Sequence, residues 1–182
     1  MVSRSARSAP ERARKTSLPG RLSVTAGLLG LLLLASCDRQ KINELEEGVA
    51  TAADVRAKFG EPVAVYDDGG GAQTLEFPRQ PEGSVNYMIS IGPDGRMTAL
   101  RQVLKPSTFA RITPGLDTQQ VRRLLGRPAK TQRFSLKQQD VWDWRFADGS
   151  EIKIFSVTFD REGRVVGSAT TLDMELAGQG GK

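Results

Sequence analysis

Side chains able to carry out covalent or acid–base chemistry are few in this sequence of 182 residues. Cys37 is the only cysteine, and no histidine occurs. The lack of histidine excludes Ser–His–Asp triads, Cys–His dyads and histidine-ligated zinc. Cys37 directly follows the most apolar run of the chain, where a lone thiol could be a buried core residue, a reactive nucleophile or a site of modification. The residues that precede it decide between these roles.

The segment before Cys37 has the parts of a secretory signal peptide. Residues 1–21 carry six basic residues and one acidic residue. Residues 22–35, LSVTAGLLGLLLLA, are apolar but too short to span a bilayer comfortably, since a helix needs roughly 20 residues to do so. A basic start, a short apolar stretch and small residues at its end are typical of a cleaved secretion signal.

The four residues that end this segment, Leu34-Ala35-Ser36-Cys37, resemble the lipobox of bacterial lipoproteins. The resemblance implies that the Cys37 thiol is acylated and that the chain is cut just before it. We therefore expect a signal peptide over residues 1–36 and a lipidated tether over residues 37–40. Two or three acyl chains give stable anchoring, so the mature protein should lie on a membrane without spanning it.

The mature chain has no surplus of charge. The whole sequence holds 26 basic and 21 acidic residues, and removal of residues 1–36 leaves 20 of each sign. Binding to nucleic acid depends on lysine and arginine side chains that neutralise phosphates. A neutral mature chain therefore argues against a nucleic-acid partner. Its 146 residues suffice for one ordinary domain or two small ones, and with one cysteine no disulfide can form within the chain.

Two segments of the mature chain resemble each other at an offset of 66 residues. TAADVRAKFGEP at residues 51–62 matches DTQQVRRLLGRP at residues 117–128. Each begins with a capping residue that has a polar partner three positions later, which predicts the start of a helix. Gly60 and Gly126 suit the left-handed position that ends a helix, and a proline follows each. The pattern predicts two short helices.

Alternating apolar and polar residues follow each helix and predict strands. TLEFP at residues 74–78 corresponds to VWDWR at residues 141–145, and NYMISIGPDGRM at residues 86–97 corresponds to IFSVTFDREGRV at residues 154–165. We therefore expect two tandem copies, at residues 41–104 and 107–173, each with a capped helix and an antiparallel meander of three or four strands. A further helix is expected at the start of the first copy, QKINELEEG, and a turn near Ser107–Ile112 in the second. Residues 174–182 are expected to form a disordered tail.

The lipobox, the helix GLDTQQVRRLLGRP and the strands VWDWRF and VTFDREGRVVG together resemble the BamE (SmpA/OmlA) family of outer-membrane lipoproteins. The same helix-helix-strand unit in tandem is similar to the β-lactamase inhibitory proteins. The resemblance implies an α+β fold in which short helices pack on one face of each antiparallel sheet. It also implies a non-enzymatic role in β-barrel protein assembly or envelope integrity, with subunits of the assembly machinery or another envelope protein as partners.

Two interpretations follow from these residues. The first is a lipid-anchored scaffold on the periplasmic side of the outer membrane. The second is a tandem inhibitor or ligand-binding module like the β-lactamase inhibitory proteins. Asp38, directly after the acylated cysteine, resembles a signal for retention in the inner membrane, which is the alternative location. No pattern of catalytic residues is evident, so we expect no enzymatic activity, no cofactor, no metal and no small-molecule substrate.

Three segments remain as candidate sites. YDDGGG at residues 66–71 lacks the alternating ligands of a calcium loop and predicts a hairpin turn. Trp142 and Trp144 share one face of a strand, where we expect core packing rather than a binding platform. The segment FPRQPEG predicts an exposed loop between two strands and supplies the candidate partner contacts, which are Phe77, Pro78, Arg79 and Pro81. The alternative interpretation, which its two prolines favour, is a stiff hairpin connection with no binding role.

Overall fold

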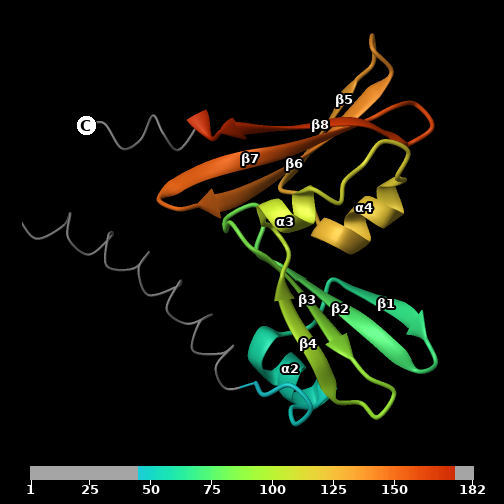
Figure 1. Ribbon diagram of the computed structural model, residues 1–182, viewed down its shortest axis with the longest axis vertical. Helices are drawn as coiled ribbons and strands as arrows, with labels where there is room; N and C mark the ends of the chain where they lie inside the picture. Colours follow the sequence, from blue (N-terminus) through green and yellow to red (C-terminus); the bar gives the residue numbers. More distant parts are fainter. Residues whose placement is uncertain (1–44, 175–182) are drawn as a thin grey trace, which may run out of the picture. The chain divides into compact units, whose positions relative to one another are not determined.

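The computed structural model describes residues 45–174 of the chain, so Cys37 and the leader lie outside the described residues. The described chain contains short helices and two antiparallel four-stranded sheets, an α+β fold (Figure 1). In the first half of the described chain the elements are α2 (Ala52–Phe59), β1 (Ala64–Gly69), β2 (Ala72–Pro78), β3 (Asn86–Ile91) and β4 (Met97–Gln102). In the second half they are α3 (Pro106–Phe109), α4 (Thr118–Leu125), β5 (Lys130–Phe134), β6 (Gln139–Asp148), β7 (Glu151–Phe159) and β8 (Val165–Leu172).

Each sheet is a meander in which sequential strands are neighbours. Sheet 1 has the order β1-β2-β3-β4, and sheet 2 has the order β5-β6-β7-β8. The expected meanders are therefore present, with four strands each. Among residues 45–174, no helix is long and apolar enough to cross a membrane.

The helices α2 and α4 begin and end as the sequence predicts. In α2 the side chain of Thr51 accepts from the Asp54 amide while Asp54 accepts from the Thr51 amide, and Asp117 and Gln120 form the same capping box in α4. Gly60 follows α2 with φ 85° and ψ −163°. This positive φ is confirmed, but the ψ value lies outside the left-handed helical region and in a region almost exclusive to glycine. Other residues, such as asparagine, tolerate the left-handed helical region, but few adopt the conformation of Gly60. Glycine is therefore required more strictly here than at an ordinary left-handed helix end.

The helix expected at the start of the first half is not present in its described part. Residues 45–50 form a turn, closed by the Ala50 amide donating to the Glu46 carbonyl at 2.9 Å. The rest of that expected helix lies outside the described residues. In the second half, the expected turn near Ser107–Ile112 is the single-turn helix α3.

Two hydrophobic cores hold the described chain together. The first lies between α2 and one face of sheet 1, and its members are Leu45, Ala50, Val55, Phe59, Leu75, Phe77, Tyr87, Ile89, Ile91 and Met97. The second lies between the helices α3 and α4 and sheet 2. Phe109 of α3 stacks on Phe155 there, with ring centroids 4.1 Å apart, and Trp144 is fully buried. The expected core role of the tryptophans is confirmed for Trp144, while Trp142 is half-buried and packs against this core.

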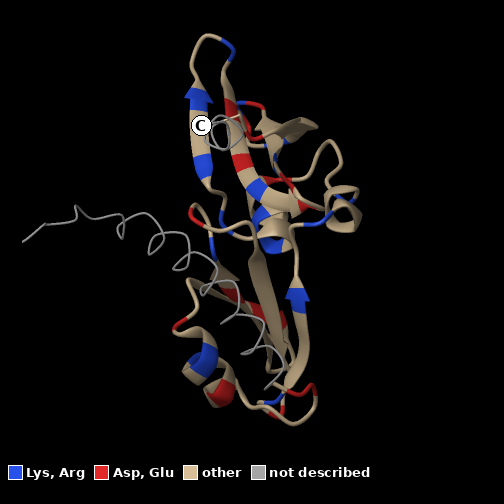
Figure 2. Cartoon of the chain, turned by 90° about the vertical axis from the view of Figure 1, so that its left-hand side faces the viewer, with Lys and Arg blue, Asp and Glu red and all other residues tan. Residues whose placement is uncertain are grey.

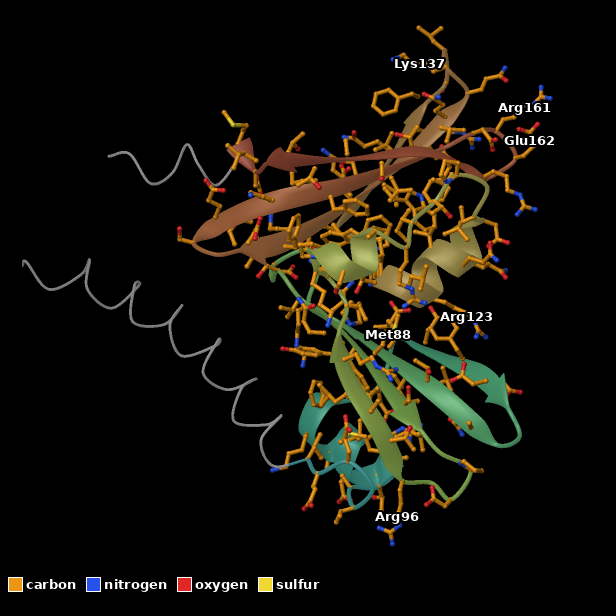
Figure 3. The ribbon with its side chains drawn as sticks, in the orientation of Figure 1. Met88, Arg96, Arg123, Lys137, Arg161 and Glu162 are labelled. Atoms are coloured by element: carbon orange, nitrogen blue, oxygen red, sulfur yellow. The ribbon has the colours of Figure 1, made fainter. Side chains whose placement is uncertain are left out.

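The second core also contains residues from the first half. Met88 of β3, together with Val103 and Leu104 of the connecting segment, belongs to the cluster around α4. Figure 3 shows Met88 between sheet 1 and the helices of the second half. The second face of sheet 1 is therefore covered around Glu76 and Met88, whereas the sequence predicts helices on only one face. The connection is part of the core rather than a spacer.

Candidate partner-binding surface

The segment expected to be an exposed loop is instead largely built into the fold. Phe77 is 2% exposed, lies in β2 and packs against Phe59 with ring centroids 5.3 Å apart. The expectation that Phe77 is exposed is therefore wrong, because the apolar alternation of β2 continues through it into the first core. Pro78 ends β2 half-buried, and the Arg79 guanidinium lies 5.5 Å from the centre of the Phe59 ring.

The rest of this loop is attached to sheet 2. The Gln80 side chain is buried, and its Nε2 donates to the Arg145 carbonyl at 2.7 Å. Its Oε1 accepts from the Arg145 amide at 3.3 Å. Because β5 pairs with β6 only as far as Asp143, Arg145 has no β5 partner, and the amide of Gln80 takes that place. Pro81 is exposed beside this contact.

A shallow hollow of about 290 Å³ lies on the outer face of sheet 2, opposite the second core. Its lining residues are Ala129, Lys130, Asp143, Arg145, Ile154, Leu172, Asp173 and Met174. The alternation of β6 predicts that Asp143 and Arg145 lie on the face opposite Trp144, and this placement is confirmed. The lining combines apolar side chains with charges of both signs.

Three of the charged side chains of the hollow, Asp143, Arg145 and Asp173, are held by hydrogen bonds. The Arg145 Nε donates to the buried carboxylate of Asp173, and its Nη1 donates to the Pro81 carbonyl at 2.9 Å. Asp143 accepts from the Ser156 hydroxyl at 2.6 Å. The structure thus brings Pro81, one of the sequence-predicted contacts, next to residues that sequence reasoning did not select. Asp173 carried no signal, because its partner lies 28 residues earlier in another strand.

A second polar cluster joins the two halves of the described chain. The Glu76 carboxylate of β2 is fully buried and accepts from the Tyr66 hydroxyl at 2.5 Å. It also accepts from Arg122 Nε and Nη2, both at 3.3 Å, and from the Arg127 amide at 2.7 Å. Burial, together with the hydrogen bond to Glu76, raises the pKa of Tyr66 to about 12. All these donors point at one carboxylate inside the protein, so the cluster is a structural junction.

Asn86 is the other polar residue at this junction. Its buried side chain donates through Nδ2 to the carbonyls of Leu125 and Arg127 at 2.8 and 2.9 Å. Its Oδ1 accepts from the Arg79 amide at 3.2 Å. Since the last carbonyls of a helix have no partner within the helix, a side chain of the first half completes the end of α4.

The described residues carry no obvious chemical centre. Among residues 45–174, no group of three His, Cys, Asp or Glu side chains could hold a metal ion. Lysine, arginine, aspartate and glutamate alternate along the strands and helices in the view of Figure 2, with no extended face of one sign. The turn predicted at residues 66–71 is shorter in the structure, because residues 66–69 belong to β1 and only Gly70 and Gly71 join β1 to β2. Asp68 accepts from Thr74 Oγ1 at 2.6 Å and from Arg123 at 3.3 Å.

The described chain is thus an α+β protein of two helix-and-sheet halves, and solved structures resemble parts of it. A candidate osmotically inducible lipoprotein, OsmE, is 24% identical with a TM-score of 0.35, over 42% of this chain and 82% of that one. A candidate β-lactamase inhibitor protein from Streptococcus mutans is 12% identical with a TM-score of 0.33, over 74% of this chain and 95% of that one. A DUF4309 family protein from Bacillus subtilis is 15% identical with a TM-score of 0.28, over 71% and 82%. No family model and no curated protein match the chain.

Proposed function

We propose that this chain is a lipid-anchored, non-enzymatic interaction protein of the bacterial envelope that binds a protein partner through the outer face of sheet 2. The single observation that carries the proposal is the hollow on that face, which is lined by apolar side chains together with the charged residues Lys130, Asp143 and Arg145. Arginine and methionine are enriched at protein interfaces, and the lining of the hollow includes both of them.

The bonding within the hollow supports a binding role. Asp173 and Asp143 accept hydrogen bonds from Arg145 and Ser156, which hold their carboxylates in place. Groups already bonded to each other form a preorganised surface, which lowers the entropy cost of binding a partner.

The partner and the compartment follow from the sequence resemblance. A lipobox and a BamE-like repeat favour the β-barrel assembly machinery as the partner, at the periplasmic side of the outer membrane. Retention in the inner membrane through Asp38 is the alternative location. The alternative function is inhibition of a soluble periplasmic protein, as in the β-lactamase inhibitory proteins.

Replacing Cys37 with serine is expected to abolish membrane anchoring, because a hydroxyl cannot form the thioether to the lipid. The mature mass and the partition into detergent should both change relative to the native chain. A Cys37→Ser protein that matures to the same mass and still partitions into detergent would contradict the lipoprotein proposal. Density-gradient separation of the two membranes, with Asp38→Ser for comparison, tests the location.

Charge reversal at the hollow is expected to weaken capture of the partner. Lys130→Glu changes an exposed residue of the hollow, while Lys137→Glu makes the same change in the β5–β6 turn outside it (Figure 3). Crosslinked pull-downs from the native host should recover fewer barrel-assembly subunits with Lys130→Glu than with the native chain. The decrease should be about tenfold if the contact is central to the interface. Lys137→Glu should leave the recovered amount unchanged. Equal recovery from both variants would argue against the hollow, and recovery of a soluble periplasmic enzyme would favour the inhibitor.

A further inference from the structure

The four edge strands of the two sheets differ in how their free backbone groups are protected. Natural proteins block edge strands with charges, prolines, bulges or short strands, because an open edge pairs readily with another chain. β1 carries Asp67 and Asp68 and a register shift. β4 carries Arg101, and β5 is short and carries Lys130 and Arg133.

β8 has fewer of these protections. This edge of sheet 2, drawn in red-orange in Figure 1, has the sequence VVGSATTL, with no charged residue and no proline. At eight residues it is also the longest of the four edge strands. Its register shift lies at the start of the strand, and the side chains of residues 168–172 are all exposed.

Comparison with β4, the corresponding strand of the first half, shows what β8 lacks. Both strands are covered at their start, since the Met97 amide donates to the Ala50 carbonyl and the Val165 amide donates to the Leu116 carbonyl. Farther along β4, the Glu47 carboxylate accepts from the Leu100 amide at 3.1 Å. Within the described chain, no side chain makes such a contact with the outer edge of β8.

The direction of the free groups follows from the β7–β8 pairing. The Asp173 amide donates to the Ile152 carbonyl of the β7 side at 3.0 Å. Because hydrogen-bonding direction alternates along an antiparallel strand, the backbone groups of Ser168, Thr170 and Leu172 point away from β7. They form a row of donors and acceptors ready for another strand.

We propose that β8 pairs antiparallel with β8 of a second copy of this chain, in a two-fold dimer centred on Thr170. A strand lacking charge can face its own copy without like-charge repulsion, whereas β5, with two cations, cannot. In this register, Thr170 of one copy lies opposite Thr170 of the other, and Ser168 lies opposite Leu172. All the residues whose backbone groups point outward are then paired in both copies. Such a pairing is isologous and closes after two copies. The inference depends only on the β8 edge and stands whether or not the proposed function holds.

Disulfide crosslinking tests this register directly. In the full chain with Cys37→Ser, Thr170→Cys introduces the only thiol, and directly opposite residues of a hydrogen-bonded pair have Cα atoms about 5.5 Å apart, within reach of a disulfide. Thr98→Cys places a thiol on the exposed surface of β4 as the matched control. Under mild oxidation, Thr170→Cys should form the dimer at least about tenfold faster than Thr98→Cys, because pairing raises the effective concentration of the thiols.

A second measurement checks the register independently of Thr170. Ala169 of one copy should lie opposite Thr171 of the other, so a mixture of Ala169→Cys and Thr171→Cys chains should crosslink faster than either chain alone. Equal rates for Thr170→Cys and Thr98→Cys would overturn the proposal, because nonspecific association crosslinks both. A Thr170→Cys product with the mass of one chain plus a different protein would also overturn it, since the edge would then belong to another partner.

Discussion

Replacing Glu76 with alanine is expected to lower the free energy of unfolding by about 3–5 kcal/mol, because removal of one partner leaves a buried charge cluster uncompensated. The fully buried carboxylate accepts from Tyr66, Arg122 and the Arg127 amide. In Glu76→Ala these donors lose their acceptor in a place where water has little access. The Arg122 side chain is 34% exposed and can recover part of its hydration, which favours the lower part of this range.

The control for Glu76→Ala is the same substitution at an exposed ion pair. Glu61 lies 3.5 Å from Arg56, and its side chain is 82% exposed. Glu61→Ala is expected to cost under about 1 kcal/mol, because exposed salt bridges contribute little. Urea unfolding monitored by tryptophan fluorescence measures both variants. If Glu76→Ala were no less stable than Glu61→Ala, the junction would contribute nothing beyond a surface pair.

The same junction bears on why the two halves occur together. Met88, Val103 and Leu104 of the first half and the connection lie in the core of the second. Either half of the chain produced alone would therefore expose apolar surface as well as the polar groups around Glu76. A domain of about 60 residues hides only about 60% of its surface, which leaves little stability to lose. Cooperation of the two halves in one folded body is our prediction for the intact chain.

Replacing Gly126 with alanine is expected to destabilise the protein by about 2–6 kcal/mol, the second large effect. Gly126 has φ 75° and ψ −171°, and holding another residue in such a region costs about 1–3 kcal/mol. A Cβ at this position would also lie 3.0 Å from Asn86 Nδ2. Displacing Asn86 disturbs its bonds to the Leu125 and Arg127 carbonyls, and a buried polar group left unpaired costs about 1–3 kcal/mol.

Gly60 provides a matched control for Gly126. It ends α2 in nearly the same conformation, and a Cβ there would have no atom within 4 Å. Gly60→Ala therefore measures the backbone strain alone, and the difference between the two variants isolates the contact with Asn86. Thermal and urea unfolding should show Gly126→Ala as the less stable variant by about 1 kcal/mol or more. A smaller difference would mean that Asn86 adjusts without loss.

The candidate surface was only partly predictable. Alternation along β6 places Asp143 and Arg145 opposite Trp144, since successive side chains of a strand point to opposite faces. Alternation cannot show that Gln80, 65 residues earlier, bonds to the backbone of Arg145. The contact depends on where β5 stops pairing and on how the loop after β2 turns. For the same reason, the sequence predicts an exposed loop at this place, whereas in the structure the Gln80 side chain attaches the loop to β6.

The sequence by itself determined the local elements of the described chain. Thr51 with Asp54, and Asp117 with Gln120, define the helix starts because their hydrogen bonds span only three residues. Only the tertiary structure decided that Phe77 and Glu76 are buried and that Met88 belongs to the second core. The physical reason is distance along the chain: caps and turns are closed by neighbours, whereas burial of Glu76 requires Arg122, 46 residues away, to pack against it.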